Sequence, residues 1–329
     1  MKAYLQAIGF HFPEYCLTND ILSRQHPEWS ADKISKKTGI QRRYITSEEE
    51  TAADLATKAA ENLFSQGIDR SCVDFIILCT QSPDYYLPTT ACIIQERLKL
   101  SEKCGAFDFN LGCSGFVYGL GIAKGLIVSG QAKNVLLLTA ETYSKYLNPE
   151  DKSCRTLFGD AAAATLVTAE RMDNGFNASI LQSSFKTIGK DYQYLIVRDG
   201  GARNHITHID SEDRFLYMDG KAIFDFSAES VPKELSSNIA LNGYQMEDVD
   251  YFILHQANLY MMNIIRMRCG FPADKHIIDL QDGGNTVSST IPIALKRWSH
   301  GRVMTPGTKM SLCGFGVGLS VACVMLSFE

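Results

Sequence analysis

Residues 67–78 read Gly-Ile-Asp-Arg-Ser-Cys-Val-Asp-Phe-Ile-Ile-Leu, and residues 243–254 read Gly-Tyr-Gln-Met-Glu-Asp-Val-Asp-Tyr-Phe-Ile-Leu. The offset between them is constant, because 243 − 67 and 249 − 73 both equal 176. Each stretch ends in Val-Asp followed by an aromatic and apolar run, which is typical of a β-strand covered by helices on both faces. Self-similarity at a fixed offset predicts a duplicated core.

The segments around this repeat alternate between strand-like and helix-like patterns. Helical spacing covers 51–66, 114–129 and 290–298, and apolar runs that predict strands cover 105–111, 134–139, 275–280 and 308–313. Such alternation predicts a largely parallel sheet with helices on its faces. We therefore expect a layered α/β fold of two similar halves, residues 1–170 and 171–329, that pack as one unit. The polar stretch 198–214 is expected to form an elaborated loop or lid.

Composition excludes several classes of protein. The chain has 329 residues, of which 45% are hydrophobic and 21% charged, an ordinary globular composition. Its 32 basic and 37 acidic residues give a net charge of −5, which argues against a nucleic-acid binder driven by phosphate neutralisation. We find no apolar run of about 18 residues and no secretion signal at the start. The sequence therefore predicts a cytoplasmic protein with no membrane span and no nucleic-acid partner.

The ten cysteines include no Cys-x-x-Cys pair, so neither a disulfide framework nor a zinc site is expected. His205 and His208 are three residues apart, but no third ligand is evident, and we interpret them as surface-loop histidines. The sequence thus predicts no metal site. Most of the cysteines lie in apolar stretches, where Cys behaves as a small buried hydrophobe.

Cys113 differs from the other thiols, because it lies in Asn-Leu-Gly-Cys-Ser-Gly-Phe (110–116) between a predicted strand and a predicted helix. A thiol there is at the positive end of the helix dipole, which favours the thiolate. The flanking glycines permit a tight turn and close approach by a substrate. The position predicts a nucleophile, although a buried structural cysteine explains it equally well.

Further polar groups follow other predicted strands. His255 comes directly after the buried run 251–254, and Asn258 is placed to cap the next helix. Asn285 follows two glycines, and its amide could donate to a developing oxyanion, as could backbone N–H groups of Gly-Phe-Gly-Val-Gly at 314–318. Ligands bind at the carboxyl ends of strands in open α/β sheets. The alternatives are a merely hydrogen-bonded histidine, a turn asparagine and a hairpin turn.

In this order, these segments resemble the thiolase-fold condensing enzymes, most closely the 3-oxoacyl-acyl-carrier-protein synthase III family. The matching motifs are Lys37-Thr38-Gly39-Ile40, Pro88-Thr89-Thr90-Ala91-Cys92, Cys113-Ser114-Gly115-Phe116, Leu157-Phe158-Gly159-Asp160-Ala161, His255-Gln256-Ala257-Asn258, Gly284-Asn285-Thr286 and Gly314-Phe315-Gly316-Val317-Gly318. The resemblance covers essentially the whole chain. It implies a thiolase-like fold of five layers, with two stacked sheets between helices.

The resemblance also implies roles for these residues. Cys113 would accept an acyl group from a thioester, and His255 with Asn285 would promote decarboxylation of malonyl carrier protein. Backbone N–H groups of Cys113 and of Gly316 or Val317 would form the oxyanion hole. The product would be a 3-oxoacyl carrier protein of fatty-acid or specialised lipid or polyketide synthesis. No permanently bound cofactor is implied, because the phosphopantetheine arrives on the substrates, as acyl carrier protein or coenzyme A.

Several positions are implied to contact the carrier protein or its pantetheine arm. They are Lys37, Lys152, Gln256, Ala257, Asn258, Leu259 and Tyr260. Lys33, Lys152 and Tyr260 replace a tryptophan and two arginines that hold the coenzyme A adenine in well-known members. Lysine cannot stack as guanidinium does, so we expect the acyl donor to be a carrier protein or an unusual thioester rather than acetyl-CoA.

Two surface features are also expected. Arg42, Arg43, Arg266 and Arg268 could form a basic rim for an acidic carrier protein, although an ordinary solvated face explains them equally well. Leu87 occupies the position from which family members project a phenylalanine across a homodimer interface into the partner's acyl pocket. A leucine there would admit a longer or branched acyl group.

Two other functions remain open at this point. The first is an acyltransferase of the same fold that passes the Cys113 acyl group to an alcohol or amine without condensation. The presence of both His255 and Asn285 disfavours it. The second is a non-catalytic subunit that binds acyl chains, and an intact Cys-His-Asn set disfavours that as well.

Overall fold

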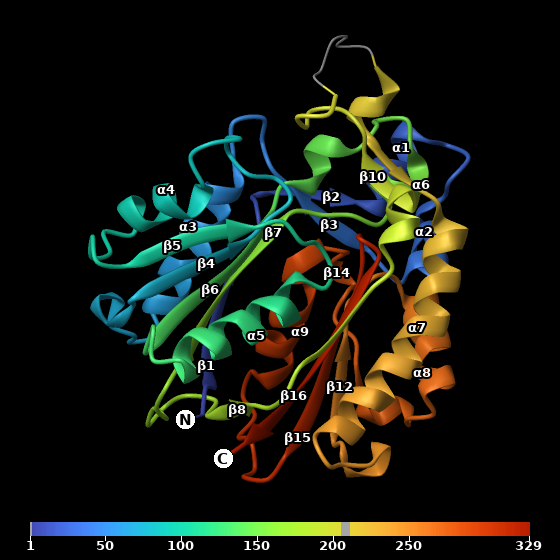
Figure 1. Ribbon diagram of the computed structural model, residues 1–329. Coiled ribbons are helices and arrows are strands. Elements are labelled where there is room, and N and C mark those ends of the chain that lie inside the picture. Colours follow the sequence, from blue (N-terminus) through green and yellow to red (C-terminus); the bar gives the residue numbers. More distant parts are fainter. Residues whose placement is uncertain (1, 205–210) are drawn as a thin grey trace.

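A computed structural model describes residues 2–204 and 211–329 of the chain. Over these residues, helices and sheets form five layers, with two sheets separated by a middle layer of helices and covered by helices on both outer sides (Figure 1). This arrangement confirms the layered α/β fold that the sequence predicts. The polar stretch 198–214 contains residues 205–210, so His205 and His208 lie outside the described residues.

The two sheets have the same strand order, which confirms the duplication. The N-terminal sheet runs β5 (Gly105–Phe109), β4 (Phe75–Cys79), β6 (Asn134–Glu141), β7 (Ala161–Thr168) and β1 (Tyr4–His11). The C-terminal sheet runs β13 (His276–Ile277), β12 (Tyr251–Leu254), β15 (Lys309–Gly316), β16 (Ser320–Phe328) and β9 (Ser184–Thr187). In both, the second strand is parallel to the first and third, and the later pairs are antiparallel. The repeated sequence stretches lead into β4 and β12, the equivalent second strands.

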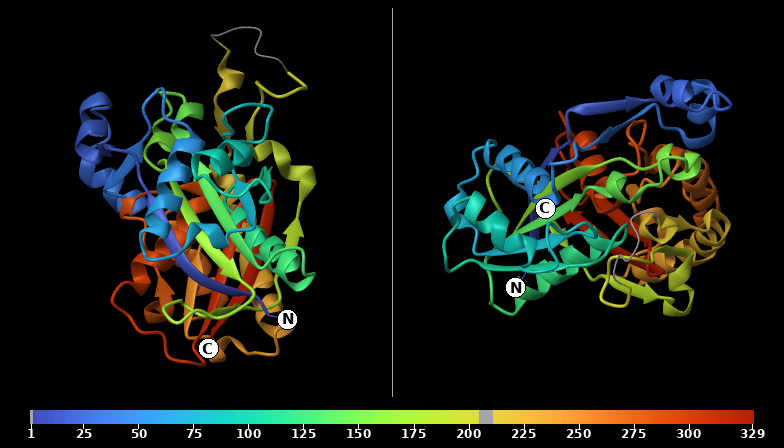
Figure 2. Two further views of the ribbon diagram at one scale, coloured as in Figure 1. Left: turned by 90° about the vertical axis from the view of Figure 1, so that its left-hand side faces the viewer. Right: turned by 90° about the horizontal axis from the view of Figure 1, so that it is seen from above.

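The short strand β8 (Ala178–Ile180) joins the two sheets, because it pairs with β1 on one side and with β16 on the other. The hydrogen-bonded path therefore continues from one half into the next. Both ends of the chain lie near this junction (Figure 2), where the Lys2 ammonium lies 2.6 Å from the Glu329 carboxylate. The halves thus share backbone pairing as well as side-chain contacts.

Apolar side chains fill the spaces between the layers. The middle layer consists of α5 (Gly115–Val128) and α9 (Thr290–Ser299), and its core includes Phe116, Leu120, Ile291 and Leu295. The outer helices α3 (Ala52–Phe64) and α4 (Thr90–Arg97) cover the N-terminal sheet, and α7 (Gly220–Leu241) and α8 (Leu259–Cys269) cover the C-terminal sheet. Burial of both faces explains why the strands read as nearly continuous apolar runs.

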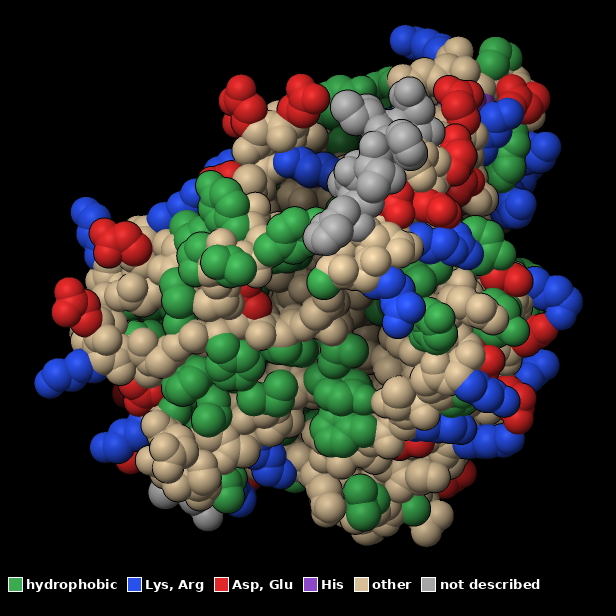
Figure 3. Space-filling view, turned by 45° about the horizontal axis from the view of Figure 1, so that its top comes forward, with side chains coloured by type: hydrophobic (Ala, Val, Ile, Leu, Met, Phe, Trp, Pro, Cys, Tyr) green, Lys and Arg blue, Asp and Glu red, His purple; other side chains and the backbone are tan. Residues whose placement is uncertain are grey.

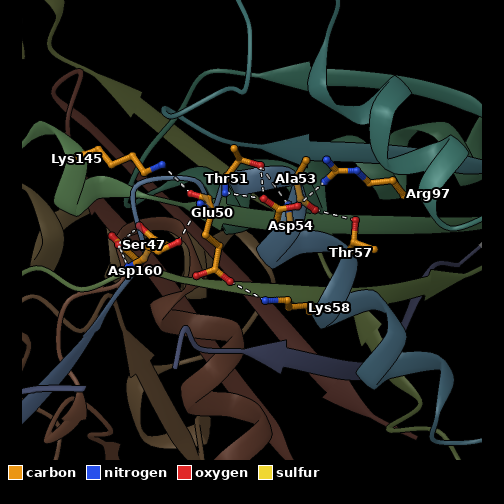
Figure 4. Close-up of polar contacts among 11 residues, drawn as sticks. Ser47, Glu50, Thr51, Ala53, Asp54, Thr57, Lys58, Arg97, Lys145 and Asp160 are labelled. Atoms are coloured by element: carbon orange, nitrogen blue, oxygen red, sulfur yellow. Dashed lines mark hydrogen bonds and ion pairs between the residues drawn. The ribbon is translucent and has the colours of Figure 1, made fainter. Parts of the chain in front are cut away.

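Polar contacts fix the start of α3. The Thr51 hydroxyl accepts from the Asp54 N–H while the Asp54 carboxylate accepts from the Thr51 N–H, a capping box that satisfies otherwise unpaired backbone donors. Arg97 of α4 donates to the other Asp54 oxygen over 2.9 Å. Figure 4 shows this network beside the Glu50–Lys58 ion pair. These contacts tie the two outer helices together behind the N-terminal sheet.

One strand is shorter than the sequence predicts. The run 275–280 was expected to form a strand, but β13 covers only His276–Ile277. Beyond it, the Asp279 N–H donates to Gln256 Oε1 over 2.7 Å, and Gln256 Nε2 donates to the Leu254 carbonyl over 2.6 Å. The buried Gln256 side chain thus makes the hydrogen bonds that a longer β13 would make. After β13 the chain leaves the sheet and continues toward Asn285.

Smaller elements stand beside the layers (Figure 2). They are β2 (Tyr15–Thr18), β3 (Arg42–Ile45) and β14 (Asp282–Gly283) in one small sheet, β10 (Leu195–Val197) and β11 (Leu216–Met218) in another, and the helices α1 (Asn19–Gln25), α2 (Ala31–Thr38) and α6 (Lys152–Arg155). Among the described residues, no helix is both long and apolar enough to cross a membrane.

Candidate active site

Cys113, His255 and Asn285 line one cavity of about 590 Å³. Cys113 lies between β5 and α5, His255 directly after β12, and Asn285 two residues after β14. All three are nearly buried, with 7%, 2% and 5% of their surfaces exposed. The structure therefore brings together a thiol from the first half and an imidazole and an amide from the second.

Close backbone packing holds Cys113 in place. A Cβ atom added to Gly314 would lie 2.7 Å from the Cys113 carbonyl oxygen, and one added to Gly316 would lie 2.8 Å from Cys113 Sγ. Only glycine therefore lets the last hairpin, β15–β16, approach the thiol so closely. From this hairpin the backbone N–H of Val317 acts on the Cys113 thiol and lowers its pKa, against the effect of burial. Residues 314–318 thus lie at the turn between β15 and β16, the hairpin that one interpretation of the sequence predicts, and their role as oxyanion donors stays a prediction.

The imidazole of His255 is held on one nitrogen and one face. Its Nδ1 lies 2.8 Å from the Thr290 hydroxyl, at the start of α9, and its ring meets that of Phe315 edge to face at 5.5 Å. Burial lowers the pKa of His255 to about 3. The ring is therefore neutral at physiological pH, and one of its nitrogens carries a proton that it can donate.

Asn285 is fixed by both halves of the chain. Its N–H donates to the Leu157 carbonyl over 2.9 Å, and its carbonyl accepts from the Gly159 N–H over 3.0 Å. Its side-chain Oδ1 accepts from the Val287 N–H over 2.9 Å. Val287 has a φ of 54°, a conformation that costs a β-branched residue about 1–3 kcal/mol. With Oδ1 engaged, the amide N–H groups of Asn285 are left to donate.

The acid–base state of Cys113 differs from the sequence-based expectation. Burial raises the pKa of the Cys113 thiol to about 12, although the Val317 N–H acts in the opposite direction. The expectation that the helix N-terminus favours the thiolate is therefore wrong for the protein without substrate, because desolvation outweighs it. Cys113 is therefore a thiol at neutral pH.

Glu141 is a buried acid near the site that sequence analysis missed. It ends β6, and its carboxylate accepts from the Gln81 N–H over 3.0 Å, from the Ser82 hydroxyl over 3.1 Å and from the Ser288 hydroxyl over 3.0 Å. Burial raises the pKa of Glu141 to about 8. Ser288 lies between Asn285 and Thr290, so Glu141 anchors the segment that holds both donors. The sequence signal was a charged residue at the end of an otherwise uncharged strand.

The mouth of the cavity contains an indole that the sequence analysis also missed. Trp29 lines the cavity, and the ammonium groups of Lys33 and Lys37 lie 5.6 and 5.0 Å from its ring centroid. The cavity therefore has a tryptophan, Trp29, although Lys33 occupies the position at which well-known family members have theirs. Lys37, Ala257, Asn258 and Tyr260 also line the cavity, in agreement with their predicted places. Asn258 caps α8 as expected, accepting from the Met261 N–H.

Other residues that the resemblance assigned to the pantetheine arm lie elsewhere. Gln256 is fully buried in the contacts between β12 and the chain after β13, so it cannot contact a ligand in the cavity. Leu259 packs against Ile40 and Leu280 behind the cavity wall. Lys152 is paired with Glu28 and does not line the cavity. The assignments of Gln256 and Leu259 therefore need correction, because each side chain is held in a structural contact, whereas the assignment of Lys152, in a partly exposed ion pair, stays a prediction.

The prediction of a basic rim for a carrier protein is wrong for one of its arginines. Arg43 has no exposed surface, and its guanidinium donates to Asn19 Oδ1 over 2.8 Å and to the Thr156 carbonyl over 2.9 Å. It holds the cavity wall near residue 156 from inside and cannot meet a partner. Arg42 pairs with Asp282 at the surface. Leu87 does not line the cavity of its own chain, and 83% of its surface is exposed.

A thiol that shares a cavity with a neutral imidazole and an amide is typical of one class of enzyme. This set, at the meeting of two duplicated halves, is the arrangement of the thiolase-fold condensing acyltransferases.

Comparisons with known proteins agree. Models of the 3-oxoacyl-[acyl-carrier-protein (ACP)] synthase III family match residues 107–189, and models of its C-terminal part match residues 239–328. The chain is 34% identical to the beta-ketoacyl-[acyl-carrier-protein] synthase III of Clostridium perfringens over 99% of both chains, and 35% identical to that of Nitratidesulfovibrio vulgaris over 98% of both. The chain belongs to the 3-oxoacyl-[acyl-carrier-protein] synthase III family.

Solved structures lead to the same family. One 3-oxoacyl-(acyl-carrier-protein) synthase III is 45% identical, covers 100% of both chains and has a TM-score of 0.95. The beta-ketoacyl-[acyl carrier protein] synthase III of Thermus thermophilus is 30% identical over 99% of both chains, with a TM-score of 0.89. The protein is thus an enzyme, a condensing acyltransferase with a thiolase-like fold.

Proposed function

We propose that Cys113 is the acyl-accepting nucleophile of a decarboxylative condensation. Its sulfur attacks the carbonyl of an acyl thioester, a C–S bond forms, and the pantetheine thiol leaves with the proton that Cys113 loses. The N–H groups of Cys113 and Val317 stabilise the oxyanion of the tetrahedral intermediate. The observation that carries the proposal is that Cys113, His255 and Asn285 line a single cavity.

The second half of the reaction uses the two neutral donors. Malonyl carrier protein loses carbon dioxide, and the electrons of the broken C–C bond form an enolate. N–H groups of His255 and Asn285 donate to the enolate oxygen, which stabilises it by about 3–4 kcal/mol per well-placed donor. The enolate carbon attacks acyl-Cys113, a C–C bond forms, the C–S bond breaks, and the Cys113 thiolate takes a proton from water. The product is a 3-oxoacyl carrier protein.

The cavity suits a pantetheine arm, which acyl carrier protein and coenzyme A share. Apolar side chains such as Ile223 and Phe224 line its walls, and lysines of α2 surround its mouth. We propose a carrier protein as acyl donor, because two of the three departures from a coenzyme A site remain. Position 152 is a lysine, paired with Glu28, and position 260 is a tyrosine that stacks on Phe224 with 5.8 Å between ring centroids, so neither supplies a guanidinium.

A homodimer accounts for the exposed segment around Leu87. Tyr85, Tyr86 and Leu87 expose 62%, 83% and 83% of their surfaces, a cluster of apolar side chains that water solvates poorly. Hydrophobic side chains also gather over the middle of the face in Figure 3, whereas charged side chains lie mostly around its edge. We propose that Leu87 reaches the acyl end of the partner's site. Light scattering of the intact protein tests the dimer.

A panel of thioesters tests the proposed chemistry. The enzyme is incubated with acyl-CoA and acyl carrier protein substrates of increasing chain length, and intact mass spectrometry reads the adduct. We expect an acyl adduct on Cys113, faster from the carrier protein, that disappears when malonyl carrier protein is added. Cys113→Ala is the control that should show no adduct.

The outcomes separate the alternatives. An adduct that malonyl carrier protein does not discharge, but an alcohol or amine does, would show transfer without condensation. No adduct from any thioester would show a binding subunit. Equal rates from acetyl-CoA and the acetyl carrier protein would contradict the carrier-protein donor while leaving the condensation intact.

A further inference from the structure

The hydroxyl of Ser114 does not cap the helix that follows it. Ser114 is the N-cap residue of α5, a position from which a serine side chain normally accepts from a backbone N–H of the first turn. Here no such bond forms, although Ser114 has no exposed surface. Among the described residues, its hydroxyl has one hydrogen-bond partner, the Ser320 hydroxyl of β16 at 2.8 Å. The residue after Cys113 thus contacts the last hairpin with its side chain.

The protons of the two hydroxyls decide which way these hydrogen bonds run. Ser320 Oγ also lies 2.9 Å from the Val317 carbonyl oxygen, which can only accept. The single proton of Ser320 therefore goes to Val317, and the Ser114 hydroxyl donates to Ser320 Oγ. The opposite arrangement, in which Ser320 donates to Ser114, would leave the Ser114 proton without an acceptor among the described residues.

These two hydrogen bonds end on the residue whose backbone acts on the nucleophile. The Val317 N–H acts on the Cys113 thiol, and the Val317 carbonyl accepts from Ser320. Val317 lies between two glycines, the residue type that restricts the backbone least, so contacts from outside the turn must hold its conformation. The Ile188 N–H donates to the Leu319 carbonyl over 2.8 Å on one side of the turn. The two serines hold the side next to Cys113.

We propose that Ser114 and Ser320 are positioning residues for acyl transfer, because their hydrogen bonds hold Val317 in place as an oxyanion donor. This inference rests on the proposed function, in which the Val317 N–H stabilises the tetrahedral intermediate. Neither serine touches the substrate. The two serines have no part in the decarboxylation of malonyl carrier protein, for which His255 and Asn285 are the donors.

Removal of the Ser320 hydroxyl should slow acylation more than removal of the Ser114 hydroxyl. Ser320→Ala deletes the contact to Val317, and the acylation rate at saturating thioester should fall about 10- to 30-fold, because a displaced oxyanion donor stabilises less. Ser114→Ala removes only the bond that orients Ser320, and the rate should fall about 3- to 10-fold. The KM for the thioester should change by less than about twofold, because the oxyanion is absent from the bound substrate.

The double variant tests whether the two hydroxyls act in series. Because Ser114 acts only through Ser320 Oγ, adding Ser114→Ala to Ser320→Ala should slow acylation no further than Ser320→Ala alone. Two independent contacts would instead multiply their effects. A double variant that is slower by the product of the two single losses would overturn the proposal.

Release of carbon dioxide from malonyl carrier protein, measured without an acyl donor, separates positioning from damage to the fold. It should stay within about twofold of the wild type in all three variants. Ser311→Ala is the matched control, because Ser311 is a fully buried serine of β15 whose hydroxyl has no hydrogen-bond partner among the described residues. This control should keep both half-reactions at the wild-type rate. Equal losses of both half-reactions in Ser320→Ala, or an equal loss of acylation in Ser311→Ala, would overturn the positioning role.

Acylation of the wild-type enzyme separates this inference from the proposed function. If the wild type forms no acyl adduct on Cys113 with any thioester, the proposed function fails and this inference fails with it. If the wild type is acylated and Ser320→Ala is acylated at the same rate, only the role of the two serines fails.

Discussion

Cys79 and His255 occupy the same place in the two halves, since 255 − 79 equals the 176-residue offset of the repeat. Cys79 ends β4, and His255 directly follows β12, the equivalent strand. Both are buried beside the same cavity region, yet only His255 opens into it. The two halves thus have two equivalent strand ends, and only one of them places a side chain in the cavity.

The two strand ends differ in the connection that leads from each strand to the next helix. Cys79 Sγ donates to the Leu111 carbonyl over 2.8 Å, and a Cβ on Gly115 would lie 2.2 Å from that sulfur, so backbone encloses the thiol. In the second half only residues 256–258 separate His255 from α8, whereas ten residues, 80–89, separate Cys79 from α4. The segment that carries Cys113, between β5 and α5, therefore encloses the Cys79 thiol, whereas His255 lines the cavity.

The largest expected effect tests the open strand end. His255→Ala should slow decarboxylation of malonyl carrier protein by about 10²- to 10³-fold, because one donor to the enolate oxygen is lost. Acylation of Cys113, followed by intact mass, should continue within a fewfold of the wild-type rate. Loss of both steps to the same extent would contradict the division of labour between the two halves.

A smaller effect is expected where the halves meet at the thiol. Gly316→Ala places a methyl group 2.8 Å from Cys113 Sγ, and displacement of the sulfur should slow acylation by about 10- to 100-fold. Stopped-flow acylation assays measure this change.

Gly125→Ala is the control for Gly316→Ala. Nothing lies within 4 Å of the added Cβ in the middle of α5, so this variant should acylate normally and gain about 0.5–1 kcal/mol of stability. A normal acylation rate in Gly316→Ala would show that the hairpin does not confine the sulfur.

A substitution of Cys79, at the enclosed end of β4, should lower stability and leave the reaction rate unchanged. Cys79→Ala removes a buried sulfur and its hydrogen bond, and the free energy of unfolding should fall by about 1–2 kcal/mol. Denaturant titration measures this loss, with Cys92→Ala, an exposed thiol, as the control. Decarboxylation should be unaffected. A loss of decarboxylation as large as that of His255→Ala would remove the distinction between the two strand ends.

The pH dependence of stability should also differ between the halves, because Glu141 and His255 should tilt it in opposite directions. Burial raises the pKa of Glu141 from 4.5 to about 8, so its contribution to stability is present at low pH and is lost as the pH rises toward 8. Burial lowers the pKa of His255 from 6.5 to about 3, so stability is lost as the pH falls below 6.5.

Melting temperatures of variants test this opposition. Glu141→Gln should flatten the fall in melting temperature between about pH 5 and pH 8, and His255→Ala should flatten the fall on the acid side. Identical profiles for the wild type and both variants would show that neither group couples its ionisation to folding.

Local patterns predicted much of the fold and three of the residues that meet in the cavity. The repeated runs before β4 and β12 revealed the duplication, because a strand covered on both faces must be apolar throughout. Cys113, His255 and Asn285 were found because each follows a strand, and the carboxyl ends of parallel strands meet at one edge. The resemblance to a family then supplied their order.

Groups whose place depends on tertiary contacts could not be found in this way. Gln256 lies next to His255 in the sequence, yet it faces the opposite side and fills a gap in the sheet. Arg43 reads as a surface charge next to Arg42 but is fully buried. The place of Trp29 depends on the path of the chain before α2, which no local pattern fixes.

The three residues of β8 limit how the molecule can be divided. Separation before β8 would leave an open edge on β1 in one fragment and on β8 in the other, and such edges recruit other chains. A cut in the connection before β8, at 169–177, should therefore yield pieces that reassociate or aggregate. Fusion of two ancestral single-half proteins would have removed the open strand edges, because β8 pairs with β1 on one side and with β16 on the other.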